Sequence, residues 1–353
     1  MSDNKKYVAY VGTYTHENSV GIHVYDIDTK EGVLTERSVA PINNPSDLCV
    51  SKDGKMVYSI EDEGVAAFTI DQKTGDLTKV NQAWIGGMRG CSVDVDSARR
   101  YLFVGGFHDG RVTMMRLNPD GSMGDIADGI FHQGLAISSA RKRLDHPKVS
   151  CVRLTPDEKY LCAADHGLNQ VKVYRVDYKR GKLHLVDIIR CALDSGPRAL
   201  HFSPDGAFLY ILDELTCEIE IYRYKDFEDE PEFDLIDTVS VLDKASNADG
   251  ASDFCMSEDG KQVFVSIDGF NGCSCLDRDE KSGMLTLLSS EPTSGYFPKS
   301  LSTLPDGDFV AVLNHDNSEI RTFRSMEGGR YALMKNAPVK VDKPNCIRIF
   351  RLA

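Results

Sequence analysis

The strongest constraint on the fold is a sequence unit that recurs six times along this chain of 353 residues. Each copy has a short alternating apolar run, a turn such as SPDGA or TPDEK, and a second apolar run with aromatic residues. The turn residues are separated by 44, 60, 48, 54 and 47 positions and are Asp53, Ser97, Asp157, Asp205, Asp259 and Asp306. This spacing accommodates four short strands and their connections, whereas helical repeats would not carry these turns.

Two further runs complete each unit. A third alternating segment follows, as in GVAAFTI, VKVYRV and EIEIYRY, and polar turns such as DQKTGDL and DYKRGKL lead into a fourth. Alternation with period two, interrupted by turns of Gly, Asp, Asn and Lys, predicts antiparallel strands. Each unit is therefore expected to form one blade of a β-propeller.

The two ends of the chain can supply a seventh blade. The N-terminal region contributes YVAYVGTYT, GIHVYDI and VLTERS, and the missing inner strand is best supplied by NCIRIFRL, from Asn345 to Leu352. Strands from both termini would then close the ring and remove exposed sheet edges. The prediction is an all-β, seven-bladed propeller over residues 1–353, a single domain with four antiparallel strands per blade.

The long interval between Ser97 and Asp157 is explained by the segment 120–146. This segment is rich in Gly, Ser, Asp and Arg and has weak periodicity, so we predict a long loop between blades. A lid over a binding mouth and a passive connector both fit this composition.

The charge balance argues against several classes of partner. With 41 Lys and Arg against 54 Asp and Glu, the formal net charge is −13, which disfavours binding to nucleic acid or to anionic membranes. No secretion signal or membrane-spanning run is evident, so we expect a cytoplasmic protein, and nothing indicates its oligomeric state.

The ten cysteines show no zinc-site spacing, and Cys273 and Cys275 fit alternate positions on one strand face. We therefore expect reduced thiols, no metal and no cofactor.

Candidate functional residues follow from the geometry of a blade. The residues before the first strand and after the second lie at one end of the propeller, because these two strands form a hairpin. The charged and histidine residues at these positions are Glu61, Arg89, Lys148, Asp165, Arg198, Asp213, Glu214, Asp268, Lys299 and His315, with His146 and His166 next to them. Four cations at one mouth suit a small anionic ligand, and the carboxylates and imidazoles can transfer protons. A strand-end Asp can also simply cap a turn.

Four segments in order are YVGTYT, NPSDLCVSKDGKMVY, TPDEKYLCAADHGLNQVKVYRV and SGPRALHFSPDGAFLYILDELTCEIEIYRY. They resemble the blade signatures of the lactonase family of seven-bladed propellers, which includes bacterial 6-phosphogluconolactonases and is similar to fungal carboxymuconate-cyclising enzymes. The resemblance covers nearly the whole chain. It implies that Arg198 of the Gly-Pro-Arg motif and Glu214 act at the active site, where Lys148, His146 or His315 could supplement them.

The chain departs from the family pattern at three positions. Family members commonly carry Pro-His before the inner strand of the fourth blade, where this chain has Pro147-Lys148 and a histidine displaced to His146. Asp268 stands where an arginine is frequent, and Ala199 stands where a histidine usually follows Gly-Pro-Arg. These departures leave the identity of the general base open.

The resemblance implies hydrolysis of a sugar-acid lactone, with 6-phosphoglucono-δ-lactone of the pentose phosphate pathway as the leading substrate. Arg198 would hold the phosphate or the developing oxyanion, and Glu214 would act as the base or orient water. The expected partner is thus a small anionic lactone or sugar phosphate. Two alternatives remain: an enzyme that lactonises a carboxymuconate-like dicarboxylate, and a non-catalytic propeller that binds a ligand or a protein.

Overall fold

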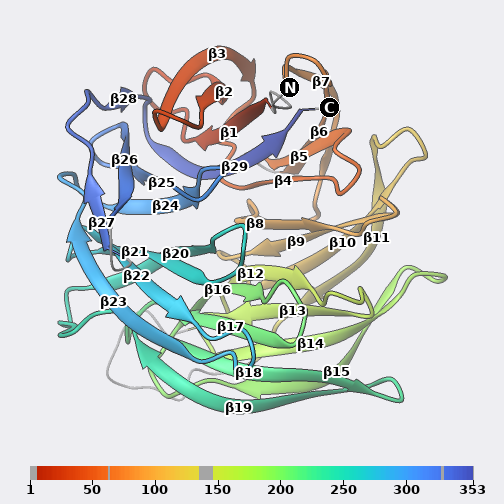
Figure 1. Ribbon diagram of the computed structural model, residues 1–353. Helices are drawn as coiled ribbons and strands as arrows, with labels where there is room; N and C mark the ends of the chain where they lie inside the picture. The colour runs from red at the N-terminus through yellow and green to blue at the C-terminus, as the bar shows by residue number, and fades with distance from the viewer. Residues whose placement is uncertain (1–5, 63, 135–145, 327–329, 353) are drawn as a thin grey trace.

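The computed structural model describes residues 6–62, 64–134, 146–326 and 330–352. Within these ranges the chain forms 29 strands in seven antiparallel sheets, which Figure 1 shows arranged as a ring around a central axis. The same ranges contain no helix, and so none that could cross a membrane. The predicted seven-bladed β-propeller is therefore confirmed.

Each blade is given from its innermost to its outermost strand. Blade 1 comprises β29 (Pro344–Arg351), β1 (Tyr7–Thr13), β2 (Gly21–Asp28) and β3 (Val33–Pro41). Blade 2 comprises β4 (Leu48–Val50), β5 (Met56–Ile60), β6 (Gly64–Ile70) and β7 (Leu77–Trp84). Blade 3 comprises β8 (Ser92–Val95), β9 (Tyr101–Gly106), β10 (Arg111–Leu117) and β11 (Met123–Phe131). Blade 4 comprises β12 (Val149–Leu154), β13 (Tyr160–Asp165), β14 (Gln170–Asp177) and β15 (Lys182–Arg190).

The remaining three blades repeat this order. Blade 5 comprises β16 (Pro197–Phe202), β17 (Phe208–Asp213), β18 (Glu218–Phe227) and β19 (Glu230–Ser240). Blade 6 comprises β20 (Gly250–Met256), β21 (Gln262–Asp268), β22 (Gly272–Arg278) and β23 (Leu285–Pro292). Blade 7 comprises β24 (Pro298–Thr303), β25 (Phe309–Asn314) and β26 (Glu319–Met326), with β27 (Arg330–Leu333) and β28 (Val339–Lys340) both paired to β26.

The ring is closed by β29, as the sequence predicts. This strand pairs antiparallel with β1 from Tyr7 opposite Arg351 to Thr13 opposite Pro344. It also contacts β24 and β4, the inner strands of the two neighbouring blades. Figure 1 shows the two ends of the chain side by side at this seam. With β29 in place, β1 is paired on both sides, to β29 and to β2, and blade 1 has four strands like the other blades.

The hydrophobic core lies between the blades. The buried apolar residues form seven clusters, and each cluster draws its members from two neighbouring sheets. The second strand of a blade is consequently covered on both faces, as in β9 and β17, where all six residues are buried. This double burial explains why these strands have nearly continuous apolar sequences instead of strict alternation.

The repeated turn owes its sequence to one hydrogen-bonding pattern. In blade 2, Asp53 Oδ1 accepts bonds from Ser51 Oγ at 2.7 Å and from Lys55 N at 3.2 Å. Gly54 between them has a φ of 67°, a left-handed conformation that favours glycine. Asp259 makes the same two contacts with Ser257 and Lys261 in blade 6. The Ser-x-Asp-Gly signature thus fixes the tight hairpin between the first two strands of a blade.

The prediction of a loop over residues 120–146 is wrong in its first half. Residues 123–131 form β11, which pairs with β10 as the outermost strand of blade 3. An outermost strand has one free edge and little core to cover, so its apolar alternation is weak, and Ile126 and Ile130 are only half-buried. Residues 135–145 lie outside the described residues, and the possible lid falls mainly on them.

Candidate active site

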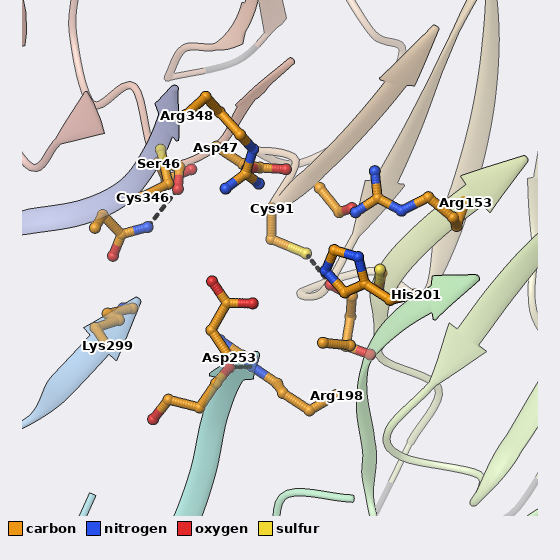
Figure 2. Close-up of a pocket in the computed structure, with 16 residues that line it drawn as sticks. Ser46, Asp47, Cys91, Arg153, Arg198, His201, Asp253, Lys299, Cys346 and Arg348 are labelled. Atoms are coloured by element: carbon orange, nitrogen blue, oxygen red, sulfur yellow. Dashed lines mark hydrogen bonds and ion pairs between the residues drawn. The ribbon is translucent and has the colours of Figure 1, made fainter. Parts of the chain in front are cut away.

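The innermost strands of five blades share a bulge near one mouth of the propeller. The register skips one residue in β12, β16, β20, β24 and β29, and the skipped residues are Ser150, Arg198, Ser252, Lys299 and Asn345. A bulge takes a residue out of the hydrogen-bonded ladder and redirects its side chain. All five residues line the axial channel, on which Figure 2 shows side chains of the inner strands converging.

The channel opens at this mouth into a larger cavity of about 960 Å³. The residues lining the cavity are Phe107, Lys148, His166, Arg198, Glu214, Leu215, Asn247, Ala248, Asp249, Gly250, Ser252, Asp268 and Phe297. Four of the residues singled out in the sequence are among them: Lys148, Arg198, Glu214 and Asp268. The cavity volume and its mixture of aromatic, charged and small residues are typical of a small-molecule site.

A carboxylate, a guanidinium and an imidazole meet in this cavity. Glu214 Oε2 lies 3.9 Å from Arg198 Nε and 3.3 Å from His166 Nε2. Arg198 comes from the bulge of β16, and Glu214 follows directly after β17 in the same blade. His166 comes from the neighbouring blade, and its ring centroid lies 5.6 Å from that of Phe107. Two potential hydrogen-bond donors thus flank one oxygen of a carboxylate that faces the cavity.

His166 is the site residue whose role the sequence left open. It follows Asp165, the last residue of β13, just as Glu214 follows Asp213, the last residue of β17. His166 is only 2% exposed, and within the described residues neither ring nitrogen has a hydrogen-bond partner. The sequence could have identified His166 as a site residue. In blades 4 and 5 the first residue after the second strand is the one that lines the cavity.

The structure places Asp165 and Asp213 between the blades and away from the cavity. Successive residues of a strand point to opposite faces, so the last strand residue and the next one cannot both face the mouth. Asp165 is fully buried, and its carboxylate accepts bonds from Lys148 N at 2.8 Å and Leu168 N at 3.1 Å. Its other oxygen lies 2.7 Å from His132 Nδ1. Asp165 therefore anchors the backbone before β12 and after β13.

Asp213 occupies the equivalent position in blade 5 with different surroundings. Its side chain is fully buried, and Glu220 of β18 lies nearby. Burial, followed by the charge of Glu220, holds the pKa of Asp213 well above its usual range. This shift favours the neutral form of the Asp213 carboxyl, which has none of the hydrogen bonds that Asp165 accepts.

Three of the remaining predicted residues gather around Tyr14, which follows β1. Lys299 Nζ lies 5.1 Å from the Tyr14 ring centroid and 5.1 Å from that of Phe297, and Arg89 Cζ lies 5.1 Å from the Tyr14 centroid. The His315 ring packs edge-on against Tyr14, and its Nδ1 lies 3.0 Å from the Pro344 carbonyl oxygen. Aromatic faces thus contact both cations.

Burial changes the ionisation of two of these groups. Desolvation, together with the positive charge of Arg198, lowers the pKa of Lys299 to about 8. Desolvation and the charge of Lys299 lower the pKa of His315 to about 4. His315 is therefore neutral near pH 7, whereas Lys299 is mostly charged but close to its titration range.

Glu61 and His146 lie outside the cavity. Glu61 Oε2 is 3.4 Å from Lys79 Nζ of β7, which places its carboxylate toward the outer strand of blade 2. His146 is exposed, shortly before β12 begins. Neither residue lines the channel or the mouth cavity. A position before or after an inner strand is thus insufficient to bring a side chain to the site.

The deeper channel holds charged groups that bind one another. Arg348 Nη2 lies 2.7 Å from Asp47 Oδ1, and Figure 2 shows these two side chains turned together. Asp253 Oδ2 accepts a bond from Ser300 Oγ at 2.7 Å. Among the described residues no group of three or more His, Cys, Asp or Glu side chains is arranged to hold a metal ion. All ten cysteines are unpaired, with Cys273 and Cys275 both buried on β22.

Comparisons with known proteins agree with this architecture. Residues 8–349 match the family model described as a lactonase, 7-bladed beta-propeller. The 6-phosphogluconolactonase of Bacillus subtilis (strain 168) is 29% identical over 97% of this chain and 98% of its own length. That of Formosa agariphila is 27% identical over 89% of this chain and 91% of its own length.

A solved structure extends the comparison to three dimensions. The periplasmic gluconolactonase PpgL of Pseudomonas aeruginosa superimposes with a TM-score of 0.91, at 25% identity, over 99% of this chain and all of its own. Because the family model spans nearly the entire chain, the match covers every blade. The chain belongs to the lactonase family of seven-bladed β-propellers.

Proposed function

We propose that this chain hydrolyses a sugar-acid lactone, with 6-phosphoglucono-δ-lactone as its substrate. The observation that carries the proposal is the placement of Glu214 between Arg198 and His166 in the mouth cavity. The names of the relatives from Bacillus subtilis and Formosa agariphila support the substrate class. Lactones are activated esters, so a positioned base and a cation at the carbonyl oxygen are sufficient machinery for their hydrolysis.

The reaction requires one proton to move from water to the ring oxygen. Glu214 takes a proton from water as the water oxygen bonds to the lactone carbonyl carbon. Arg198 stabilises the negative charge that develops on the carbonyl oxygen. The bond between this carbon and the ring oxygen then breaks, and the proton passes from Glu214 to the departing oxygen. The product is the open-chain hydroxy acid, and the carboxylate of Glu214 is restored.

His166 has a positioning role in this mechanism. Its Nε2 lies beside Glu214 Oε2, so an N–H at that atom can hold one carboxylate oxygen and leave the other for the attacking water. Lys148 and Asp268 line the same cavity and provide a cation and an acceptor for substrate hydroxyl groups. The proposed base, the oxyanion-binding cation, the positioning imidazole and the groups for substrate binding are thus all residues that line the mouth cavity.

The decisive experiment measures initial rates with freshly prepared 6-phosphoglucono-δ-lactone, corrected for spontaneous ring opening. We expect Glu214→Gln to lower kcat/KM by about 10²–10⁴-fold, since the base is lost, and Arg198→Ala by about 10²–10³-fold. Arg180→Ala, whose side chain is highly exposed and whose turn lies between β14 and β15, is the control. No rate above background in the natural protein would refute the proposal. Formation of a lactone from a carboxymuconate-like dicarboxylate would instead identify a cyclising enzyme.

We also propose a cytoplasmic location. The ten cysteines are unpaired, and seven of them are buried, six of these on strands, a pattern that suits a reducing compartment. Subcellular fractionation of the natural host tests this proposal, and recovery of the protein outside the cytoplasm would refute it.

A further inference from the structure

Arg89 and Lys299 lie beside the Tyr14 ring, and Lys299 also lines the axial channel. Among the described residues, neither Lys299 nor Arg89 makes an ion pair or a hydrogen bond through its side chain, and their contacts are with aromatic rings. Most other basic side chains near the inner strands have a carboxylate, such as Arg348 with Asp47. Burying an unpaired charge is unfavourable, so a partly buried cation without a partner points to a ligand that supplies the missing charge.

The two cations and Arg198 come from three different blades. Arg89 precedes β8 of blade 3, Arg198 lies in the bulge of β16 in blade 5, and Lys299 lies in the bulge of β24 in blade 7. The nearest carboxylate to Arg198 is Glu214, at 3.9 Å from its Nε. The net charge of the whole chain is −13, so this convergence of three positive groups runs against the general composition. It creates a local field suited to a compact anion.

Tyr14 contacts two of these cations through its ring. Its ring centroid is 5.1 Å from both Arg89 Cζ and Lys299 Nζ, and His315 and His16 pack against other sides of the ring. The Tyr14 backbone N donates a bond to the Lys343 carbonyl oxygen at 3.0 Å, which fixes the residue at the end of β1. A phenol held in this position can add a hydrogen-bond donor to the three cations.

We propose that Arg89 and Lys299, which both contact the Tyr14 ring, form with Arg198 at their border a subsite for the phosphate group of a phosphorylated lactone. This inference rests on the proposed function and specifies how the substrate lies. Arg198 lines both the channel and the mouth cavity, so it separates the phosphate end from the end where Glu214 acts. A phosphomonoester dianion can accept bonds from several cationic donors at once, which a hydroxyl group at the same position cannot.

The ionisation of Lys299 is consistent with this subsite. The titratable or charged groups that influence it are Arg198, Glu214, Arg89 and Cys91, with His315 close by. The pKa of Lys299 is about 8, whereas those of Cys91 and His315 are about 12 and about 4, so the latter two are uncharged and do not titrate near pH 8. A bound dianion would favour the ammonium form of Lys299 and raise its pKa.

The first test compares 6-phosphoglucono-δ-lactone with glucono-δ-lactone in the natural protein and in Lys299→Met and Arg89→Gln. We expect each variant to lower the ratio of the two kcat/KM values, phosphorylated over unphosphorylated, by about 10–100-fold, because a charge-assisted bond to phosphate is lost. Lys182→Met on the outer strand β15 is the matched control and should keep the ratio of the natural protein. An unchanged ratio in folded Lys299→Met and Arg89→Gln would overturn the subsite, even if both lactones are hydrolysed.

A second measurement separates failure of the subsite from failure of the proposed function. Titration of inorganic phosphate into the protein by calorimetry at pH 8, in buffers of different ionisation enthalpy, reports both affinity and proton uptake. We expect proton uptake in the natural protein and in Glu214→Gln, and weaker binding without this uptake in Lys299→Met. If neither lactone is hydrolysed but this pattern is found, the subsite stands and the proposed reaction fails. Equal phosphate binding in the natural protein and Lys299→Met would overturn the subsite.

Discussion

His166 Nε2 lies 3.3 Å from Glu214 Oε2, and the two residues occupy the same position in consecutive blades. Because successive blades repeat the same geometry, His166 and Glu214, which are far apart in the sequence, lie next to each other at the mouth. The lactonase-family resemblance implies a histidine before the inner strand of the fourth blade, where this chain has Lys148. His166 places an imidazole beside the Glu214 carboxylate. It follows β13, whereas Lys148 precedes β12, the other strand of the same hairpin.

Replacing His166 tests its positioning role. We expect His166→Leu to lower kcat by about 10–100-fold with little change in KM, because the Glu214 carboxylate loses the group that holds it. His166→Gln, which retains a hydrogen-bond donor, should recover part of kcat. The measurement is steady-state kinetics with the phosphorylated lactone, and His184→Leu on the exposed face of β15 is the control. Equal losses in the Leu and Gln variants, or a change confined to KM, would count against this role.

Replacing Lys299 should stabilise the protein while impairing binding. Its folded-state pKa of about 8 is below the ordinary value of 10.5, so the charged form is disfavoured by folding. We expect Lys299→Met to raise the free energy of unfolding by about 1–3 kcal/mol at pH 7. Urea unfolding monitored by circular dichroism measures this change.

The pH dependence of this gain has a definite sign. Between pH 8 and 10.5 the unfolded natural chain holds more protons at Lys299 than the folded one, so the stability of the natural protein rises with pH. The advantage of the Lys299→Met variant should therefore be complete below about pH 8 and vanish above about pH 10.5. An advantage that stays constant across this interval would show that the stability change has another origin.

The two buried aspartates should respond differently to substitution. Asp165→Ala removes an acceptor for Lys148 N and Leu168 N and for the neighbouring His132, so we expect it to cost about 3–5 kcal/mol of stability. Burial raises the pKa of Asp213 and favours its neutral carboxyl, which an amide resembles in size and charge, so we expect Asp213→Asn to change the stability by no more than about 1 kcal/mol. Chemical unfolding of both variants provides the comparison. A large loss in Asp213→Asn would show that its carboxyl is ionised in the folded protein.

Removal of β29 should open the ring. A chain that ends at Lys343 lacks the strand that pairs with β1 and contacts β24 and β4, so blade 1 would expose an inner edge. We expect aggregation or a loss of cooperative unfolding, and recovery of the folded protein when a peptide of residues 344–352 is supplied during refolding. Size-exclusion chromatography with calorimetry measures both effects. A truncated chain that stays monomeric and unfolds cooperatively would refute the seam as a requirement for folding.

The fold could be predicted because its information is local and repeated. Each Ser-x-Asp-Gly turn specifies a hairpin, and the alternation on both sides specifies strands, as in the segments around Asp53 and Asp259. The strand β11 was missed because an outermost strand buries little, so Ile126 and Ile130 produce only a faint pattern. The sequence signal therefore weakens from the axis to the rim, in step with burial.

The candidate site was harder to predict because it depends on register. The hairpin argument placed Arg198, Glu214 and Lys299 at one end of the propeller, where the structure also has them, since chain direction alone determines which end they occupy. It could not distinguish Asp165 from His166, because a shift of one residue reverses the face of a strand. It also could not foresee the ion pair of Glu61 with Lys79, which depends on how strands β5 to β7 lie next to one another.

The bulged positions of the inner strands can accept different side chains more readily than the paired positions of the same strands. Ser150, Arg198, Ser252, Lys299 and Asn345 are skipped in the pairing register, so the sheet makes no demand on the β-propensity of their side chains. Mutation can exchange a serine for an arginine at such a place while the neighbouring pairs keep their alignment. Substrate preference can therefore evolve in small steps, because each of the five bulged blades presents one side chain that can change with little effect on folding.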